Sequence, residues 1–275
     1  IGAQIDNSSP ALADIDNDGF LEIIMGTGSW WTASGDNRVH VLRYDGSEQP
    51  GWPQTMAGDA FASCVVADIN CDGSHEIIAA TNAGYVYVWD KDGQLQANWP
   101  CYTGGYIGAT PAVGNLDADP ELEIAVCSNV AGYLQLSVLN YDTSSINTNW
   151  PKTIQGGAGN VLSSPSLADI DGDGGLEILF GGEKDPTSYN YTRVYAYKAN
   201  GSQANGWPDY LSSGASILTS PAIGDLDNNE SLEIVVCASD GKIKAITSDG
   251  TNSLPLWQIT VPFNGRTNPV IGDVD

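Results

Sequence analysis

The stretch 169–177, which reads DIDGDGGLE, has the residue types and the spacing of a loop that binds a hard cation. Acidic side chains stand at its positions 1, 3, 5 and 9, with three glycines among them. Side chains on alternate residues can converge on one point where the backbone coils tightly, and glycine permits such a coil. Ca²⁺ takes six to eight oxygen ligands. Four carboxylates and one backbone carbonyl, that of Gly175, would nearly complete this shell.

The same spacing recurs along the chain. Copies begin at residues 14, 68, 115, 169, 225 and 273, so successive copies lie 54, 47, 54, 56 and 48 residues apart. We call the first five the Asp14, Asp68, Asn115, Asp169 and Asp225 loops and predict about five Ca²⁺ sites. The expected ligands are Asp14, Asp16, Asp18, Phe20 and Glu22; Asp68, Asn70, Asp72, Ser74 and Glu76; Asn115, Asp117, Asp119, Glu121 and Glu123; Asp169, Asp171, Asp173, Gly175 and Glu177; Asp225, Asp227, Asn229, Ser231 and Glu233; and, in the sixth copy, Asp273 and Asp275.

The copies differ in quality. The Asp14 and Asp169 loops are complete, so we expect the strongest sites there. The Asp68 loop has Asn70 at position 3, and the Asn115 loop has Pro120 where glycine is expected. The Asp225 loop has Asn229 at position 5 and no glycine at all. Fewer charges and poorer turns weaken a Ca²⁺ site, so these three should bind less tightly.

Composition narrows the classes of partner. The 275 residues include 34 Asp and Glu against 10 Lys and Arg, a formal net charge of −24. This excess argues against nucleic acid and anionic membrane surfaces as partners. No apolar run of about 18 residues is present, so no membrane insertion is expected. Five bound divalent ions would bring the net charge to about −14.

Each loop sits in a repeating series of strand-like segments. A short stretch rich in small residues precedes it, an apolar run follows, and then come a further strand and a turn such as Asp-Gly. We predict four antiparallel strands per repeat and no helix. A period near 50 residues made of short strands is typical of the blades of an all-β propeller. The expected first strands are 8–13, 62–67, 110–114, 164–168 and 220–224, and the expected third strands are 39–44, 85–89, 133–139, 193–197 and 242–246.

Two other residue types recur at fixed places. Tryptophan precedes proline once in each of four repeats, which favours packing wedges between blades over ligand platforms. These are Trp52, Trp99, Trp150 and Trp207. Cys127 and Cys237 take a place that small residues fill in the other repeats, so we expect buried free thiols. A Cys71–Cys101 disulfide is left open.

The unit resembles the FG-GAP/VCBS repeat of integrin α-subunit propellers and of secreted bacterial proteins. Residues 106–111, YIGATP, resemble the phrase that names the repeat, and the D-x-D-x-D-G-x-x-E loop resembles its calcium loop. The resemblance implies a propeller, usually seven-bladed, with calcium loops on one face. It also implies an extracellular setting, secreted or at the cell surface, and binding more often than catalysis. An EF-hand is similar only over the first five positions, because its glutamate stands at position 12.

The repeats define one propeller domain over residues 1–275. Their approximate limits are 8–61, 62–108, 109–162, 163–218, 219–266 and 267–275, the last being the start of another repeat. Segments 1–13 and 260–272 both match a first strand and would compete for one place in a five-bladed ring. We therefore expect further blades from the rest of a longer polypeptide or from another chain.

Two insertions between the second and third strands are the candidate ligand sites. Residues 26–37 contain Trp30 and Trp31, and residues 181–191 contain Tyr189 and Tyr191. We expect them on the face opposite the calcium loops, where exposed aromatic rings could contact a carbohydrate or a protein. The alternative is that the insertion folds over the neighbouring blade and buries the rings.

No catalytic residues are predicted, because neither His40 nor His75 has a serine or cysteine partner at a readable spacing. Three functions follow in order of preference. The first is a calcium-stabilised extracellular binding or adhesion module. The second is a non-catalytic structural propeller of a larger secreted enzyme or surface assembly. The third is a polysaccharide lyase or hydrolase propeller.

Overall fold

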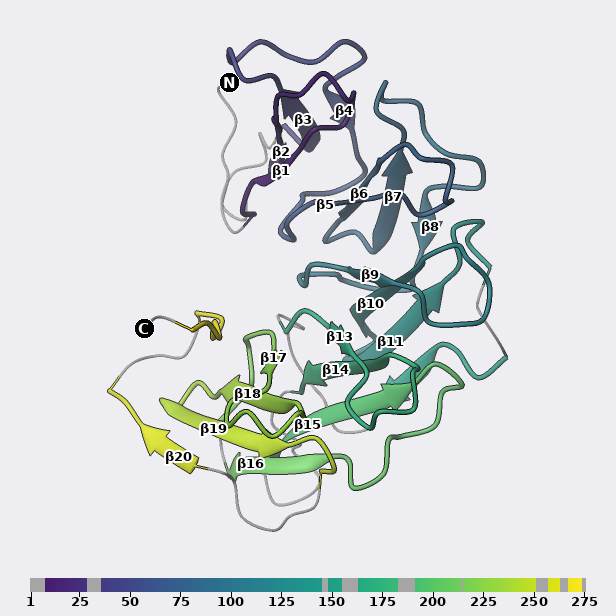
Figure 1. The fold of residues 1–275 in the computed structure, drawn as a ribbon. Helices are drawn as coiled ribbons and strands as arrows, with labels where there is room; N and C mark the ends of the chain where they lie inside the picture. The colour runs from purple at the N-terminus through teal and green to yellow at the C-terminus, as the bar shows by residue number, and fades with distance from the viewer. Residues whose placement is uncertain are drawn as a thin grey trace. The chain divides into compact units, whose positions relative to one another are not determined.

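The computed structural model describes residues 8–28, 36–144, 148–154, 163–182, 191–213, 215–250, 257–262 and 267–273, with the backbone alone for residues 191 and 210–213. The described chain is all-β, and each sheet is built from four consecutive antiparallel strands (Figure 1). The first sheet contains β1 (Ala11–Ala13), β2 (Glu22–Gly26), β3 (Arg38–Leu42) and β4 (Gln54–Thr55). The second contains β5 (Val65–Ala67), β6 (Glu76–Ala80), β7 (Tyr85–Trp89) and β8 (Cys101–Tyr102). The third contains β9 (Ala112–Gly114), β10 (Glu123–Val130), β11 (Tyr133–Leu139) and β12 (Lys152–Ile154). The fourth contains β13 (Ser166–Ala168), β14 (Glu177–Gly181), β15 (Tyr191–Lys198) and β16 (Asp209–Ser213). The fifth contains β17 (Ala222–Gly224), β18 (Glu233–Cys237), β19 (Lys242–Thr247) and β20 (Trp257–Thr260).

The chain divides into two compact units. The first comprises Ile1–Ala131 and Ser137–Ile146, and the second comprises Gly132–Leu136 and Asn147–Asp275. The first unit holds the first two sheets with β9 and β10, and the second holds β12 with the fourth and fifth sheets. Among the described residues, no helix is long and apolar enough to cross a membrane.

The burial of the strands follows the apolar pattern of the sequence. The second strand of each sheet opens with glutamate and continues with apolar residues, and β6, β14 and β18 are buried at every residue. Such strands are covered on both faces, as a near-continuous apolar run predicts. The first strands are three residues long, shorter than expected, because only the residues next to the loop pair with the second strand. Three third strands also differ from the expected 39–44, 193–197 and 242–246: they are β3 (Arg38–Leu42), β15 (Tyr191–Lys198) and β19 (Lys242–Thr247).

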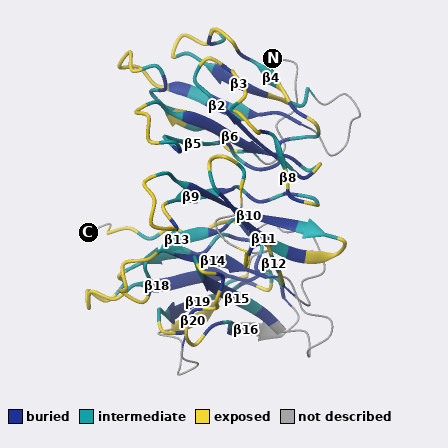
Figure 2. Cartoon of the chain, turned by 90° about the vertical axis from the view of Figure 1, so that its right-hand side faces the viewer, coloured by how far each residue is buried: buried dark blue, intermediate teal, exposed yellow. Residues whose placement is uncertain are grey.

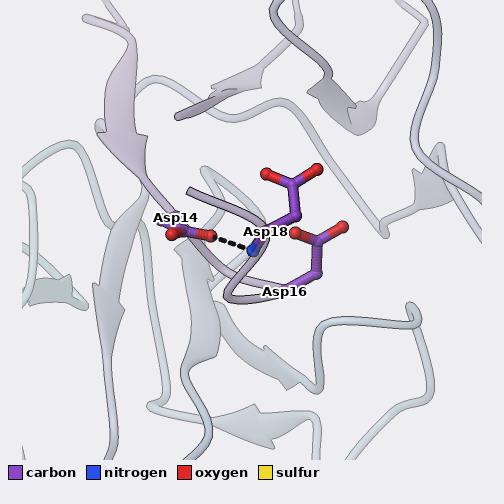
Figure 3. A group of neighbouring side chains, drawn as sticks. All are labelled: Asp14, Asp16 and Asp18. Carbon is purple, nitrogen blue, oxygen red and sulfur yellow. Dashed lines mark hydrogen bonds between the residues drawn. The ribbon is translucent and has the colours of Figure 1, made fainter. Parts of the chain in front are cut away.

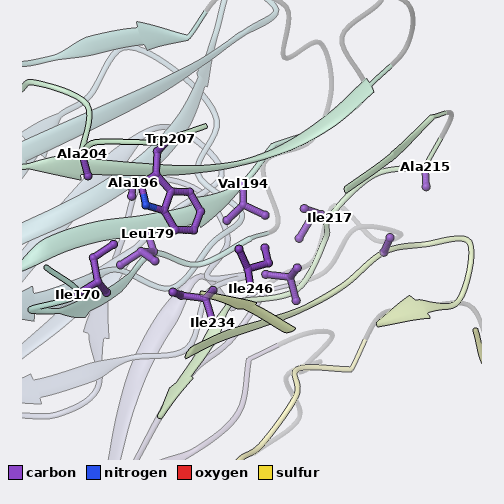
Figure 4. Packing of buried hydrophobic residues seen from close by; sticks show 12 residues of the cluster. Ile170, Leu179, Val194, Ala196, Ala204, Trp207, Ala215, Ile217, Ile234 and Ile246 are labelled. Carbon is purple, nitrogen blue, oxygen red and sulfur yellow. The ribbon is translucent and has the colours of Figure 1, made fainter. Parts of the chain in front are cut away.

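Apolar side chains from successive sheets pack into shared cores. In the second unit, one cluster joins Leu179 and Val194 of the fourth sheet to Ile234 and Ile246 of the fifth (Figure 4). In the first unit, another joins the first and second sheets. Burial is concentrated in the strands, while the connecting loops carry most of the exposed residues (Figure 2).

The repeated tryptophans are packing wedges, as predicted. Their side chains are buried, and each indole Nε1 donates a hydrogen bond to a backbone carbonyl of the next repeat. The pairs are Trp52 with Lys91 (3.0 Å), Trp99 with Tyr141 (2.8 Å), Trp150 with Ala199 (2.8 Å) and Trp207 with Ser248 (3.1 Å). A buried indole usually finds such a partner for its N–H.

All five cysteines are free thiols. Cys127 and Cys237 are buried and free. The equivalent place needs a small residue, because a Cβ on Gly181 would lie 2.2 Å from Ile217 Cγ2. Cys71 and Cys101 are free as well, so the disulfide left open by the sequence is not formed.

Candidate metal centres

Each acidic loop is the connection between the first and second strands of its sheet. In the fourth sheet, Ala168 pairs with Glu177, so the Asp169 loop lies directly at the end of the hairpin. The glutamate at position 9 is buried in all five loops. One of its oxygens, Oε2, accepts a hydrogen bond from the backbone N–H of position 2. The pairs are Ile15 with Glu22 (3.0 Å), Ile69 with Glu76 (3.0 Å), Leu116 with Glu123 (2.6 Å), Ile170 with Glu177 (2.9 Å) and Leu226 with Glu233 (2.8 Å).

The aspartate at position 1 organises the rest of the coil. Asp14 accepts hydrogen bonds from the backbone N–H groups of Asp18 (3.1 Å) and Gly19 (3.0 Å). Figure 3 shows the bond from Asp18 and the three carboxylates of this loop gathered on one coil. Asp68 and Asp225 accept equivalent pairs of bonds, whereas Asp169 accepts from Gly172 (2.8 Å) and Gly174 (2.9 Å), at positions 4 and 6. The loop is thus held by its own ligands, which turns their side-chain oxygens inward.

The coil needs two residues in the left-handed region, at positions 4 and 6. In the Asp14 loop these are Asn17 and Gly19, with φ of 60° and 90°. The Asp225 loop has no glycine and places Asn228 (57°) and Glu230 (68°) there instead. The Asn115 loop differs, since neither Ala118 nor Pro120 has a positive φ. Proline fixes φ near −65°, so this copy is forced into another turn, as its sequence indicated.

Four loops bring three acidic residues within reach of a single ion. One ligand atom from each member lies within 4.8 Å of the others. The groups are Asp14, Asp16 and Asp18; Asp117, Asp119 and Glu123; Asp169, Asp171 and Glu177; and Asp225, Asp227 and Glu233. Among the described residues, the Asp68 loop forms no such acidic group, and its Asn70 donates from Nδ2 to Glu76 Oε1 at 3.3 Å.

Two carboxylate oxygens show that a cation fits. Asp16 Oδ1 and Glu123 Oε1 are buried and have no hydrogen-bond partner among the described residues. A buried anionic oxygen without a partner is costly, and a bound cation removes the cost. The donor set is made of carboxylate oxygens with amide oxygens in the weaker copies, which suits Ca²⁺ and Mg²⁺ better than softer metals.

Burial also disturbs the protonation of the position-9 glutamates. It raises the pKa of Glu76 and of Glu123 to about 7, and nearby aspartates push in the same direction. The pKa values of Glu22 and Glu177 are raised for the same main reason. The hydrogen bond from position 2 opposes this shift in each case. A divalent cation would favour the ionised form and reverse the shift.

The Asp169 loop contains a cation supplied by the protein itself. Lys198 Nζ lies 2.5 Å from Asp171 Oδ2, 2.6 Å from Asp173 Oδ2 and 3.8 Å from Glu177 Oε1. The sequence analysis did not identify this lysine. The available signal was its position at the end of the third strand, where Lys198 is the register partner of Glu177.

The other predicted site residues fall into three groups. The residue at position 7 donates its backbone N–H to position 5 in four loops, and a ligand role for its carbonyl stays a prediction. These donors are Phe20 (2.8 Å), Ser74 (2.8 Å), Gly175 (2.9 Å) and Ser231 (2.7 Å). Asp273 is exposed. Asp275, Trp30, Trp31 and Tyr189 lie outside the described residues, and Tyr191 is described only as the first backbone residue of β15.

Five four-stranded antiparallel sheets with an acidic loop in the first hairpin define a repeat protein of the β-propeller class. The FG-GAP-like repeat family matches residues 14–79 and 169–236. The chain therefore contains FG-GAP-like repeats over these residues, as its sequence resemblance predicted.

Solved structures support the fold. The biofilm matrix protein Bap1 of V. cholerae matches with a TM-score of 0.66 and 17% identity, over 94% of this chain and 40% of Bap1. Quinohemoprotein alcohol dehydrogenase from Comamonas testosteroni matches with 0.64 and 13%, over 94% and 44%. Sqt1 of Saccharomyces cerevisiae matches with 0.59 and 15%, over 94% and 63%. This chain thus spans less than two thirds of each of these proteins. No curated protein matches the sequence significantly.

Proposed function

We propose that the chain is a calcium-stabilised extracellular binding module that recognises a carbohydrate or protein ligand. The observation that carries the calcium part is the set of five loops in which a buried glutamate closes the coil with one oxygen. In the Asn115 loop, Glu123 Oε1 is left without a hydrogen-bond partner among the described residues, as a cation ligand would be. The fold resembles that of a biofilm matrix protein, which supports a setting outside the cell.

The ligand surface is proposed from strand topology. In each sheet the acidic loop joins the first and second strands, so the link from second to third strand emerges at the opposite end. Residues 27–37 form this link in the first sheet and contain Trp30 and Trp31. A ligand bound at the end away from the acidic loops would leave the ion sites undisturbed, and tryptophan is a frequent anchor residue in binding surfaces.

A glycan array, followed by titration of any hit, tests the ligand surface. The double variant Trp30→Ala/Trp31→Ala should lose binding by at least about tenfold and keep its melting temperature. The control is Trp257→Ala, because Trp257 is 42% exposed and lies on β20, outside the insertion. Unfolding of the double variant would show that the insertion belongs to the core.

A second candidate is a non-catalytic structural propeller of a larger assembly. The chain spans only 40% of Bap1, so other parts of such a protein can carry the recognition. This reading expects no glycan or protein ligand for the chain alone. The dehydrogenase matches, at 13% identity, share the fold alone and do not favour catalysis. Turnover of an acidic polysaccharide by this chain would favour the lyase or hydrolase alternative.

A further inference from the structure

The Asp169 loop differs from the other acidic loops in having a charged partner. Lys198 extends from the end of β15, and its Nζ contacts Asp171 and Asp173 at 2.5 and 2.6 Å. Both contacts are charge-assisted hydrogen bonds from an ammonium to a carboxylate. The ammonium therefore lies where three carboxylates would hold an ion, with Glu177 Oε1 3.8 Å away.

Among the described residues, no cation forms a salt bridge with the Asp225 loop or the Asp14 loop from the equivalent place. In the Asp225 loop, the register partner of Glu233 is Thr247, which is uncharged. In the Asp14 loop, Ile23 pairs with Leu42 of β3, so the residue opposite Glu22 is Arg43. Its Nε donates to Gln49 Oε1 at 2.5 Å, and it is the neutral amide Nε2 of Gln49 that donates to Asp16 Oδ2 at 3.0 Å.

The two complete loops, the Asp14 and Asp169 loops, also differ in their salt bridges. Within the part of the chain that the structure describes, Asp14, Asp16, Asp18 and Glu22 form no salt bridge. In the Asp169 loop, Lys198 pairs with Asp171 and Asp173. Two loops with the same carboxylates thus have different electrostatic surroundings.

We propose that Lys198 is the resident counter-cation of the Asp169 loop, which makes this loop ordered without metal and a much weaker Ca²⁺ site than the Asp14 loop. An incoming ion must displace the ammonium from at least two carboxylates, and the displaced charge remains nearby to repel it. The inference rests on the proposed function, because it takes Ca²⁺ binding by the other loops as its reference. It reverses the expectation from sequence that ranks the Asp169 loop among the strongest sites.

Calorimetric titration of the metal-free protein with Ca²⁺ tests this assignment. The variant Lys198→Met keeps the aliphatic stem and removes the charge. The control is Lys242→Met, since Lys242 is similarly exposed and its Nζ pairs with Asp240 at 2.6 Å, outside the acidic loops. Lys198→Met should gain a site at least about tenfold tighter than any that the Asp169 loop shows in the wild type. The double variant Lys198→Met/Asp171→Asn should lose that gain, and Lys242→Met should match the wild type.

Melting temperatures without metal give a second readout. Lys198→Met should melt below both the wild type and Lys242→Met, and Ca²⁺ should restore it. Identical isotherms and identical metal-free melting for Lys198→Met and the wild type would overturn the assignment. A wild-type Asp169 loop that binds Ca²⁺ as tightly as the Asp14 loop would also overturn it. Absence of Ca²⁺ binding in every variant would instead contradict the proposed function, and the metal-free melting comparison would still test Lys198.

Discussion

The backbone N–H of Leu116 donates a hydrogen bond to Oε2 of Glu123 at 2.6 Å, while Oε1 of the same carboxylate is buried without a hydrogen-bond partner among the described residues. One oxygen closes the loop and the other is directed at the place where the loop gathers its acidic groups. The hydrogen bond from the backbone N–H of position 2 to Oε2 of the position-9 glutamate is present in all five loops. The position-9 glutamate is therefore both a structural residue and a candidate ligand.

This double role can be separated in the Asp14 loop by two substitutions at Glu22. Glu22→Gln keeps an oxygen for the N–H of Ile15 but removes a charge that three aspartates repel. It should weaken Ca²⁺ binding and leave the metal-free protein at least as stable as the wild type. Glu22→Ala should lose binding and also destabilise the metal-free protein by about 1–3 kcal/mol, the cost of an unsatisfied buried N–H. Calorimetry and urea unfolding would show the contrast, and equal stability of the two variants would contradict it.

The metal-free protein should become more stable as the pH falls from 8 to 5.5. Burial raises the pKa of Glu76 and of Glu123 from 4.5 to about 7. A raised folded-state pKa contributes stability that is fully present below the unfolded value of 4.5 and is lost as pH rises through about 7. Carboxylates with a lowered pKa, such as Asp173, have the opposite effect on stability, which falls as they become protonated at lower pH. The range stops at pH 5.5 so that their protonation does not contribute.

Bound Ca²⁺ should abolish or invert this trend, since protons and the ion compete for the same carboxylates. Melting temperatures of metal-stripped and Ca²⁺-loaded protein across this pH range would test both statements. A metal-free protein that grows steadily more stable toward pH 8 would contradict the assignment of buried, metal-directed glutamates.

Truncation of a wedge tryptophan should be severe. Trp99 is 5% exposed and its Nε1 donates to the carbonyl of Tyr141, so Trp99→Ala removes a core side chain and a hydrogen bond. We expect a loss of roughly 3–5 kcal/mol in the free energy of unfolding. Trp257→Ala is the matched control, because that ring is 42% exposed and should cost less than about 0.5 kcal/mol. Equal losses in denaturant unfolding would show that the repeated tryptophans are not wedges.

The Asp225 loop should gain stability from glycine. Glu230 adopts φ of 68°, where a side chain costs about 1–2 kcal/mol. Glu230→Gly removes that cost, and the greater freedom of glycine in the unfolded chain offsets part of the gain. A net rise of about 0.5–1 kcal/mol is expected. The converse control is Gly73→Ala, which has φ of 89° and no atom within 4 Å of the added Cβ, so its expected loss is conformational. A Glu230→Gly variant less stable than the wild type would contradict this account of the turn.

The sequence predicted the features that repeat. The acidic spacing, the apolar second strand and the wedge tryptophans each recur at one place per repeat, and each has the structural role expected from that recurrence. The role of a residue is easier to predict when its position recurs, because every copy of the pattern must fit the same sheet geometry.

Several contacts confined to one repeat were not predicted. Lys198 reaches the Asp169 loop from the third strand, and the contact follows from strand register rather than from the loop's own residues. Gln49 reaches Asp16 across 33 positions in the same way. The left-handed conformation of Glu230 was also missed, since glutamate, unlike glycine or asparagine, does not signal a positive φ.

Thermal unfolding of the wild-type protein with and without Ca²⁺ tests the central claim most directly. Two loops saturated at a hundredfold excess over Kd would add about 5 kcal/mol, since each site contributes RT ln(1 + [L]/Kd). For a chain of this size we expect Tm to rise by about 10 °C over the metal-stripped protein. The rise should shrink in an Asp14→Asn/Asp16→Asn variant, which removes two of the four carboxylates from a complete loop that forms no salt bridge among the described residues. A wild-type Tm that does not change between chelator and millimolar Ca²⁺ would contradict the account.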